Sequence, residues 1–385
     1  MADAAVSKTV VSRRASSTLA SGTISETDDP ANPRGRFIFR RRFDYTANAI
    51  HAITQPDKSA NTESLLLNEA DQMQPAAMSL TLRICDTNYV RTCIFGSRGN
   101  GSLRLFYNRK RHTKGSTMAV IDAHAHIYTP KIASRAVEAI GKFYNIEMFG
   151  DGTAEGLLAA KERCPITHFI VHSVATTPHS APVINDSIAS ECAKHPEFIG
   201  FATMHQDFED PATELQRARD LGLHGLKLHP DTQMVNMDDP RLMEVYAICE
   251  EMGLPVVIHT GDYRYDYSHP RRLVNILRTF PDLVVDAAHF GCWSRYEVGW
   301  DVLHEVAMNE RVFLDESSSQ YFLGQRRTVE LTRMWGTDRI MFGSDFPMWD
   351  PAREYEQLVS AGFSEDELEN ILWHNAERFA GVKVG

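Results

Sequence analysis

Five residues of types that bind metals or transfer protons recur through the C-terminal part of the chain. His124 and His126 form a His-x-His pair, and three single residues follow far downstream, namely His259, His289 and Asp345. Imidazole nitrogens and carboxylate oxygens form a ligand set that suits Zn2+ and also Fe, Mn, Co or Ni. We therefore predict a divalent metal ion, with Zn2+ as the expected ion and Mn2+, Co2+ or Fe2+ as alternatives.

These residues share one place in the local pattern, which is the end of a short apolar run. In a strand, residues i and i+2 point to the same side, so His124 and His126 point together. Lys227 and His229 end another such run, Gly-Leu-Lys-Leu-His-Pro. A lone histidine at a strand end is more often structural than a ligand, and one His-x-His pair proves little. The repetition of such residues at strand ends is what favours a shared site.

From Met118 onward, short apolar runs alternate with amphipathic stretches. The apolar runs predict eight strands, at 120–124, 168–173, 199–204, 225–229, 255–259, 283–288, 311–315 and 339–343. Helical patterns lie between them, for example at 133–143, 182–194, 211–221, 240–252 and 269–280. This alternation over residues 118–385 fits an α/β fold of the (β/α)8, or TIM, barrel type, which typically has ~250 residues. A doubly wound open sheet is the alternative, but its usual Gly-rich phosphate loop is absent.

Enzymes with a TIM barrel build their sites at the C-terminal ends of the strands. The predicted ligands, Lys227 and His229 would all lie at that face. Cys292 is expected to be a small buried hydrophobic residue. The remaining histidines are given structural roles, although His172 and His205, near the second and third strands, keep a small chance of lining the site.

Residues 1–117 differ from the rest of the chain in composition and in hydrophobic pattern. They contain 17 Lys and Arg against 10 Asp and Glu, which leaves 23 against 41 for residues 118–385. They lack sustained periodicity and are rich in Ser, Thr, Asn, Arg and Gly, so we predict a disordered extension. It could be a targeting leader, a nucleic-acid-binding tail, or a stretch upstream of a natural start at Met118. We favour the last, because Met118 stands just before a strand that carries catalytic-type residues.

The composition also limits the partners. The acidic body at 118–385 argues against nucleic acid, because phosphate binding needs clustered Lys and Arg. No run reaches the eighteen or more apolar residues of a membrane helix, so we expect no membrane partner. The six cysteines lack C-x-x-C spacing, which favours a reducing, cytoplasmic location. The expected partner is a small-molecule substrate.

The motifs together resemble the amidohydrolase superfamily, and within it the branch related to aminocarboxymuconate-semialdehyde decarboxylase, the amidohydrolase-related family. Five segments carry the resemblance: Ile-Asp-Ala-His124-Ala-His126, Gly-Leu-Lys-Leu-His229-Pro, Val-Ile-His259-Thr-Gly, His289-Phe-Gly and Gly-Ser-Asp345-Phe-Pro. The resemblance covers residues 118–385. The closing Asn-Ala-Glu-Arg-Phe is similar as well, with Trp373 and His374 standing where the family commonly has Gly.

The resemblance implies a single metal ion held by His124, His126, His259 and Asp345. It also implies that His289 is the catalytic histidine and that Asp345 transfers a proton, so these two are the predicted catalytic residues. Binuclear members of the superfamily use a carboxylated lysine on the fourth strand. Lys227 lies there, so a second ion stays open. Relatives also suggest a homodimer.

Three functions are compatible with this site. We expect a metal-dependent hydrolase first, in which metal-activated water attacks a small-molecule substrate, because hydrolysis is the commonest activity of the superfamily. The alternative is a carboxy-lyase, a non-oxidative decarboxylase of an aromatic or unsaturated carboxylic acid, since the branch contains such enzymes. A catalytically inactive binding scaffold would lack a ligand or a base, but every expected position is filled.

The candidate substrate-binding residues are Arg264, His229 and Lys227. A carboxylic acid needs a cation, and Arg264 follows the fifth strand in the aromatic segment Gly-Asp-Tyr-Arg-Tyr-Asp-Tyr-Ser-His-Pro. Alternatively, Arg264 pairs with Asp262 or Asp266 and shapes the loop. Lys227 would neutralise nearby carboxylates or bind an anionic substrate, and His229 would bind the substrate or hydrogen-bond the floor of the site.

Overall fold

The structure is a computed structural model that describes residues 119–384 and, further upstream, the backbone of residues 65–67, 79–86, 89–97 and 103–107. The chain divides into two compact units, Met1–Gly115 and Ser116–Gly385. Most of the extension for which we predicted disorder lies outside the described residues, so that interpretation stays a prediction.

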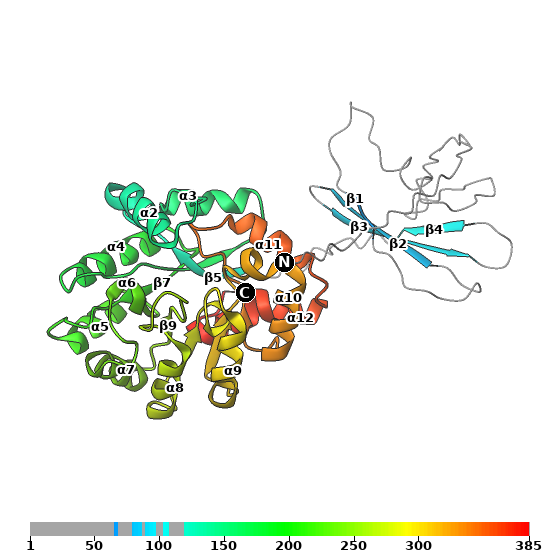
Figure 1. Ribbon diagram of the computed structural model, residues 1–385. Helices are drawn as coiled ribbons and strands as arrows, with labels where there is room; N and C mark the ends of the chain where they lie inside the picture. Colours follow the sequence, from blue (N-terminus) through cyan, green and yellow to red (C-terminus); the bar gives the residue numbers. More distant parts are fainter. Residues whose placement is uncertain (1–64, 68–78, 87–88, 98–102, 108–118, 385) are drawn as a thin grey trace, which may run out of the picture. The chain divides into compact units, whose positions relative to one another are not determined.

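The four upstream segments form an antiparallel sheet in the order β1-β2-β3-β4 (Figure 1). Its strands are β1 (Leu65–Leu67), β2 (Ser79–Asp86), β3 (Tyr89–Ser97) and β4 (Leu103–Tyr107). Strand β2 pairs with β3 along its whole length, from Ser79 opposite Gly96 to Asp86 opposite Tyr89. The sequence analysis did not predict these strands, although β2 has the apolar–polar alternation typical of a strand.

The second unit is built on eight parallel strands, which confirms the predicted (β/α)8 barrel. The strands are β5 (Ile121–His126), β6 (His168–His172), β7 (Phe198–Thr203), β8 (Gly225–Leu228), β9 (Val256–Ile258), β10 (Val285–Ala287), β11 (Val312–Asp315) and β12 (Ile340–Met341). Hydrogen bonds link the first strand to the segment after the last. The N–H of His126 donates to the Phe346 carbonyl at 2.7 Å, and the N–H of Asp345 donates to the His124 carbonyl at 2.8 Å.

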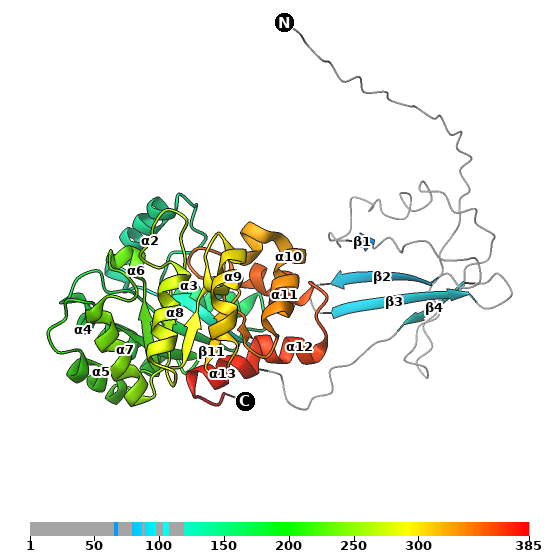
Figure 2. The same cartoon turned by 60° about the horizontal axis from the view of Figure 1, so that its bottom comes forward.

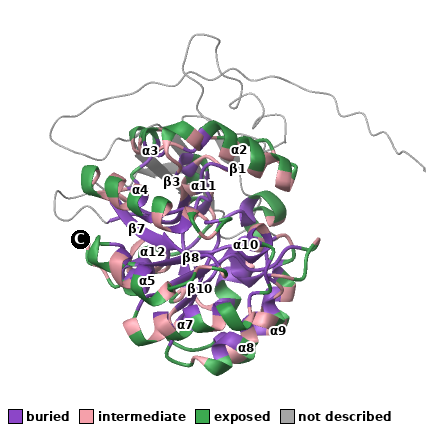
Figure 3. Cartoon of the chain, turned by 90° about the vertical axis from the view of Figure 1, so that its left-hand side faces the viewer, coloured by how far each residue is buried: buried purple, intermediate pink, exposed green. Residues whose placement is uncertain are grey.

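Helices surround these strands, with their exposed residues facing outward (Figure 3). They are α2 (Pro130–Tyr144), α3 (Ala154–Leu158), α4 (Ser180–Lys194), α5 (Pro211–Asp220), α6 (Pro230–Gln233), α7 (Pro240–Met252), α8 (Pro270–Thr279), α9 (Tyr296–Ala307), α10 (Ser319–Trp335), α11 (Pro351–Val359), α12 (Glu365–Glu369) and α13 (Asn375–Ala380). Several begin with proline, whose missing N–H breaks no helical hydrogen bond in the first turn. None of the helices in the described part has the length and apolar composition needed to span a membrane.

The interior of the barrel has an apolar lower part and a polar upper part. Alternate residues of each strand point inward. The first inward positions are apolar and pack with α13, which lies across one end of the strands (Figure 2). The next inward positions carry polar side chains. His172 follows Ile170, and Asp315 follows Phe313. The alternation that builds the core therefore also presents polar side chains at the C-terminal mouth.

Candidate metal centre and active site

Three of the predicted metal ligands lie together at the ends of the first and last strands. Asp345 Oδ1 lies 3.7 Å from His124 Nε2 and 3.6 Å from His126 Nε2. His124 is fully buried, and the side chains of His126 and Asp345 are only 12% and 9% exposed. A register shift in β5 between Asp122 and Ala125 changes which residues face inward, from Ile121 and Ala123 in the apolar cluster to His124 and His126 at the mouth.

The fourth predicted ligand, His259, is connected to this group through His289. His259 Nδ1 lies 3.1 Å from His289 Nε2, and the His289 ring centroid lies 4.9 Å from that of His124. The other nitrogen of His259, Nε2, lies 3.5 Å from Asp231 Oδ2. His124, His126 and Asp345 thus lie next to one another, whereas His259 is linked to them only through the His289 ring.

Hydrogen bonds determine which nitrogen carries the proton in three of these rings. His124 Nδ1–H donates to Asp315 Oδ2 at 2.7 Å, which leaves a lone pair on Nε2. The Ser317 hydroxyl donates its proton to Asp315, so its oxygen accepts from His289 Nδ1–H at 2.8 Å. His289 Nε2 therefore accepts from His259 Nδ1–H, and His259 Nε2 keeps a lone pair.

Asp315, at the end of β11, is a residue of this site that the sequence analysis did not assign. Besides the two side-chain donors, it accepts the backbone N–H groups of His289 at 3.2 Å and Ser317 at 3.1 Å. Burial alone would raise the pKa of Asp315, but the facing His124 and these hydrogen bonds hold it well below its usual range. A carboxylate behind a ligating histidine commonly orients the ring. The sequence did contain a signal for Asp315, because it ends the predicted strand 311–315 as the other site residues end theirs.

The donor set fits a divalent metal ion. The nitrogens of His124 and His126 that face Asp345 are both Nε2, and they lie 3.7 and 3.6 Å from its Oδ1. His126 Nδ1 and His259 Nε2, which face away from Asp345 and from His289, are buried without a hydrogen-bond partner among the described residues. Burial lowers the pKa of His124, His126 and His259, so these imidazoles are neutral, as metal ligands must be. Neutral imidazoles combined with a carboxylate suit Zn2+ and Mn2+ alike.

Lys227, at the end of the β8 segment, is a fully buried amine within this group. Its Nζ donates to His124 Nε2 at 2.9 Å and thereby holds the lone pair that a metal ion would take. Burial lowers the pKa of Lys227 to about 8, while the carboxylates of Asp315 and Asp345 oppose that shift. Metal binding at His124 therefore requires the amine to move aside.

A chain of donors orients Asp345. Trp349 Nε1–H donates to Ser318 Oγ at 2.8 Å, and the Ser318 hydroxyl donates to Asp345 Oδ2 at 2.7 Å. This leaves Oδ1 for the two histidines of β5. Asp345, Ser318 and His289 all have positive φ, at 57°, 62° and 59°. Such strain costs about 1–3 kcal/mol per residue and often accompanies function.

His229, a predicted substrate-binding residue, is held by protein groups beside His259. Its Nδ1 caps α6 by accepting the Thr232 N–H at 3.4 Å, so the proton lies on Nε2, which donates to the Tyr144 hydroxyl at 2.8 Å. Its ring stacks on that of His259, with the centroids 3.9 Å apart. The role of His229 in substrate binding stays a prediction.

Arg264, the third candidate substrate-binding residue, is partly buried and pairs with the carboxylate of Asp262 at 2.9 and 2.6 Å. It also donates to the Phe143 carbonyl and lies over the ring of Tyr144, 5.2 Å from the centroid. This is the pairing that the sequence left open as the alternative. It anchors the end of α2 at the barrel mouth, and contact between Arg264 and a substrate stays a prediction.

Tyr144, the last residue of α2, was not among the predicted site residues. His229 donates to its oxygen, so the hydroxyl proton of Tyr144 is available to another acceptor. Its ring contacts Trp293, with centroids 4.7 Å apart. Burial, and then the charge of Asp345, raise the pKa of Tyr144 well above its usual value, so the hydroxyl stays protonated. No signal marked it, because it lies on a helix rather than at a strand end.

Comparison with known proteins begins with a family model described as Amidohydrolase, which matches residues 121–382. The chain is 25% identical over 240 residues to 2-amino-3-carboxymuconate-6-semialdehyde decarboxylase from Dictyostelium discoideum, covering 52% of this chain and 66% of the relative, just under two thirds of its length. It is 26% identical over 241 residues to gamma-resorcylate decarboxylase from Rhodococcus jostii (strain RHA1), covering 50% of this chain and 73% of the relative.

Solved structures share the fold. An uncharacterised TIM-barrel protein from Bordetella bronchiseptica has 21% identity and a TM-score of 0.56, over 68% of this chain and 99% of that protein. A 2,6-dihydroxybenzoate decarboxylase from Rhizobium has 17% identity and a TM-score of 0.53, over 69% of this chain and 99% of that protein. A 5-carboxyvanillate decarboxylase from Novosphingobium aromaticivorans with bound manganese has 18% identity and a TM-score of 0.54, over 69% of this chain and 97% of that protein.

Two expectations change with these findings. Hydrolysis as the leading function is wrong, because both curated relatives are decarboxylases. The physical reason is that a neutral imidazole–carboxylate metal site can activate either water or an unsaturated acid, so the residues alone do not separate the two reactions. The family supports a divalent metal, but nothing selects zinc, since the metal in the structural neighbour is manganese.

Proposed function

Because the chain belongs to the amidohydrolase family, we propose that it is a metal-dependent, non-oxidative decarboxylase of an aromatic or unsaturated carboxylic acid. One observation carries this proposal: the two curated relatives, from different organisms, are both decarboxylases. Candidate metal donors at the C-terminal mouth of the barrel, where such enzymes build their sites, support the proposal.

The proposed ligands of the ion are His124, His126, His259 and Asp345. When bound, the ion supplies Lewis acidity that draws electron density from the substrate. We propose one ion per chain, with Mn2+ and Zn2+ as the first candidates, because both accept nitrogen and oxygen donors. The manganese bound in a structural neighbour supports testing Mn2+ first.

Decarboxylation replaces the C–C bond to the carboxylate by a C–H bond, so the protein must deliver a proton to that carbon. Asp345 is the proposed donor, because it lies beside the proposed metal ligands His124 and His126 and the Ser318 hydroxyl holds its Oδ2 in place. It takes a proton from water and passes it to the carbon that bears the carboxylate. CO2 then leaves, and the electron pair of the broken C–C bond restores the unsaturation. His289, held by Ser317, orients His259 and faces the same centre.

The substrate carboxylate needs hydrogen-bond donors within the site. Lys227 offers a buried amine, and Tyr144 offers a hydroxyl proton because His229 already occupies its oxygen. Trp293 lies against the Tyr144 ring and adds a flat apolar surface that suits an unsaturated or aromatic acid. In this proposal, Arg264 acts by anchoring the end of α2.

The test combines metal analysis with CO2 release. The full chain is loaded with Mn2+ or Zn2+ and supplied with hydroxybenzoates and muconate-type acids in the absence of an oxidant. We expect one CO2 for each acid consumed, loss of activity on chelation and recovery when metal is returned. Metal-loaded, folded protein that releases no CO2 but cleaves amides or lactones would overturn the proposal. Two equivalents of metal would revise the number of ions.

We further propose that residues 118–385 form the catalytic domain and act in the cytoplasm on a small-molecule substrate. The family match within residues 121–382 supports the domain, and the free cysteines of the described region support a reducing compartment. A chain that begins at Met118 should bind metal and turn over substrate like the full chain. Aggregation or loss of metal in the shorter chain would assign residues 1–117 to the domain.

A further inference from the structure

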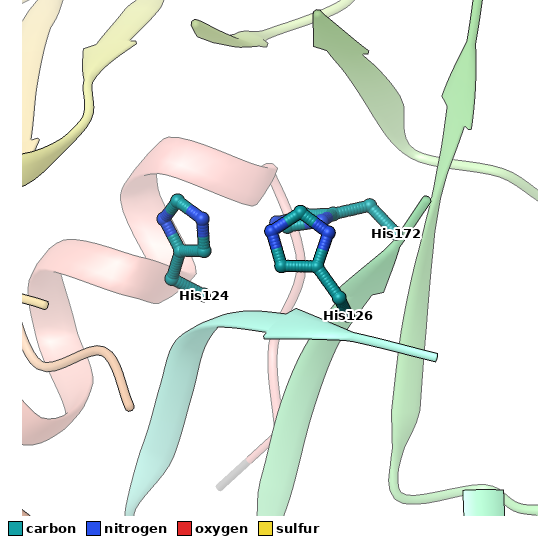
Figure 4. Close-up of side chains that lie close together, drawn as sticks. All are labelled: His124, His126 and His172. Carbon is teal, nitrogen blue, oxygen red and sulfur yellow. The ribbon is translucent and has the colours of Figure 1, made fainter. Parts of the chain in front are cut away.

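His172, at the end of β6, lies against both histidines of the His-x-His pair (Figure 4). Its ring centroid is 4.9 Å from that of His124 and 4.4 Å from that of His126, and both contacts are edge-on, at 81° and 80°. The side chain is fully buried. It therefore belongs to the same group of rings, although the resemblance to the family assigned no role to the second strand.

Neither ring nitrogen of His172 has a hydrogen-bond partner in the part of the chain that the structure describes. A buried polar group without a partner costs about 1–3 kcal/mol of stability. An imidazole kept here only for packing would incur that cost at both of its nitrogens. A neutral imidazole has one nitrogen with a lone pair, which can bind a cation.

The spacing is also suitable for a shared ion. One donor nitrogen from each of His124, His126 and His172 lies within 4.8 Å of the others. Two nitrogens that bind one ion at ~2.1 Å lie at most about 4.2 Å apart, so a small rotation of the rings brings all three to one centre.

We propose that His172 is an additional ligand of the metal ion, so that β6 contributes a donor beside those of β5, β9 and β12. This inference rests on the metal centre of the proposed function. It extends the ligand set to four imidazoles and one carboxylate, and it gives a partner to one of the two buried nitrogens of His172.

The test measures metal binding by the full chain. His172→Phe keeps the ring volume but removes both nitrogens, and its Mn2+ dissociation constant should rise about 10- to 100-fold. His124→Phe should also lose metal and serves as the positive control. His205→Phe is the matched negative control. His205 is also buried just beyond a strand, but its Nδ1 is occupied by the Asp207 N–H at 3.1 Å. Melting of the metal-free variants separates loss of a ligand from loss of folding.

A second readout uses the unmodified sequence. Pulsed EPR of the Mn2+-loaded protein with 15N-labelled histidine should count four bound imidazoles, and three if His172 is not a ligand. Wild-type affinity in His172→Phe, with His124→Phe impaired, would overturn the inference and leave the proposed metal centre intact. If the wild-type chain bound no metal, or if His124→Phe bound it normally, the proposed metal centre itself would fail.

Discussion

The lower and upper parts of the barrel interior are built from the same strands by the same alternation, yet their chemistry is opposite. In the lower part, Phe379 of α13 packs against Phe201 and Phe313, with ring centroids 5.7 Å apart in both pairs. In the upper part, the next inward positions hold groups such as His172 and His259, which have buried nitrogens without partners among the described residues.

This difference indicates what each part is for. Apolar side chains that fill the lower part gain free energy from burial, about 25 cal/mol for each Å2 removed from water. Buried polar groups without partners lose free energy unless a ligand binds them. The lower part should therefore determine stability, and the upper part should determine metal binding and turnover. Substitutions in the two parts can test this separation.

The largest effect is expected from Asp345→Asn in the upper part. The amide cannot carry the transferred proton, so turnover should fall by at least about 100-fold, measured as CO2 release from the best acid of the panel. The melting temperature of the metal-free protein should be nearly unchanged, because the change is isosteric. Asp338→Asn, at a side chain that is 66% exposed, is the control. Normal turnover by Asp345→Asn would refute its assigned role.

The converse change is Phe379→Ala in the lower part. Removing this buried ring should reduce the free energy of unfolding by about 3–5 kcal/mol, measured by denaturant titration. Below the melting range, metal affinity and kcat should stay near those of the wild type. A large loss of metal affinity in folded Phe379→Ala protein would contradict the separation of the two parts.

An intermediate effect is expected at Asp315, which orients His124 from behind. Asp315→Asn removes the negative charge, so metal affinity should fall about 10- to 100-fold in a direct titration. Asp286→Asn is a matched control on the neighbouring strand. Asp286 is equally buried, and burial and then the charge of Asp315 raise its pKa well above the usual value, so it is already uncharged. Equal losses in both variants would argue against a specific role for Asp315.

The fold was predictable because its signals are local. The apolar runs located the barrel strands to within a few residues, and proline with Asp caps marked helix starts such as that of α7 (Pro240–Met252), after Asp239. The eighth strand is shorter than predicted, because after Met341 the chain turns into the segment that carries Asp345. The upstream sheet was missed although β2 alternates, because short runs within a Ser- and Arg-rich region looked isolated.

The site was predictable only in part. Residues at strand ends were found because a barrel brings all strand ends to one face. Which ring meets which depends on strand order and side-chain direction. The sequence therefore gave His172 only a small chance of lining the site, although it pairs with His126 across β5 and β6 and contacts both histidines of β5. Tyr144 reaches the mouth from a helix, and a single sequence contains no sign of that approach. The reaction itself stayed open, because one donor set serves hydrolysis and decarboxylation.

The smallest effect, and the finest test of the comparison, is Tyr144→Phe at the rim of the upper part. The ring and its contact with Trp293 remain, while the hydroxyl that we assign to the substrate carboxylate is lost. One hydrogen bond to an anion is worth about 1.5 kcal/mol, so KM should rise about tenfold with metal content unchanged. Tyr263→Phe, at a side chain that is 68% exposed near the same mouth, should leave KM unaltered. If Tyr144→Phe lowered the melting temperature but not the affinity for substrate, the Tyr144 hydroxyl would serve only to hold His229. Tyr144 would then contribute to stability, like the residues of the lower part, and not to substrate binding.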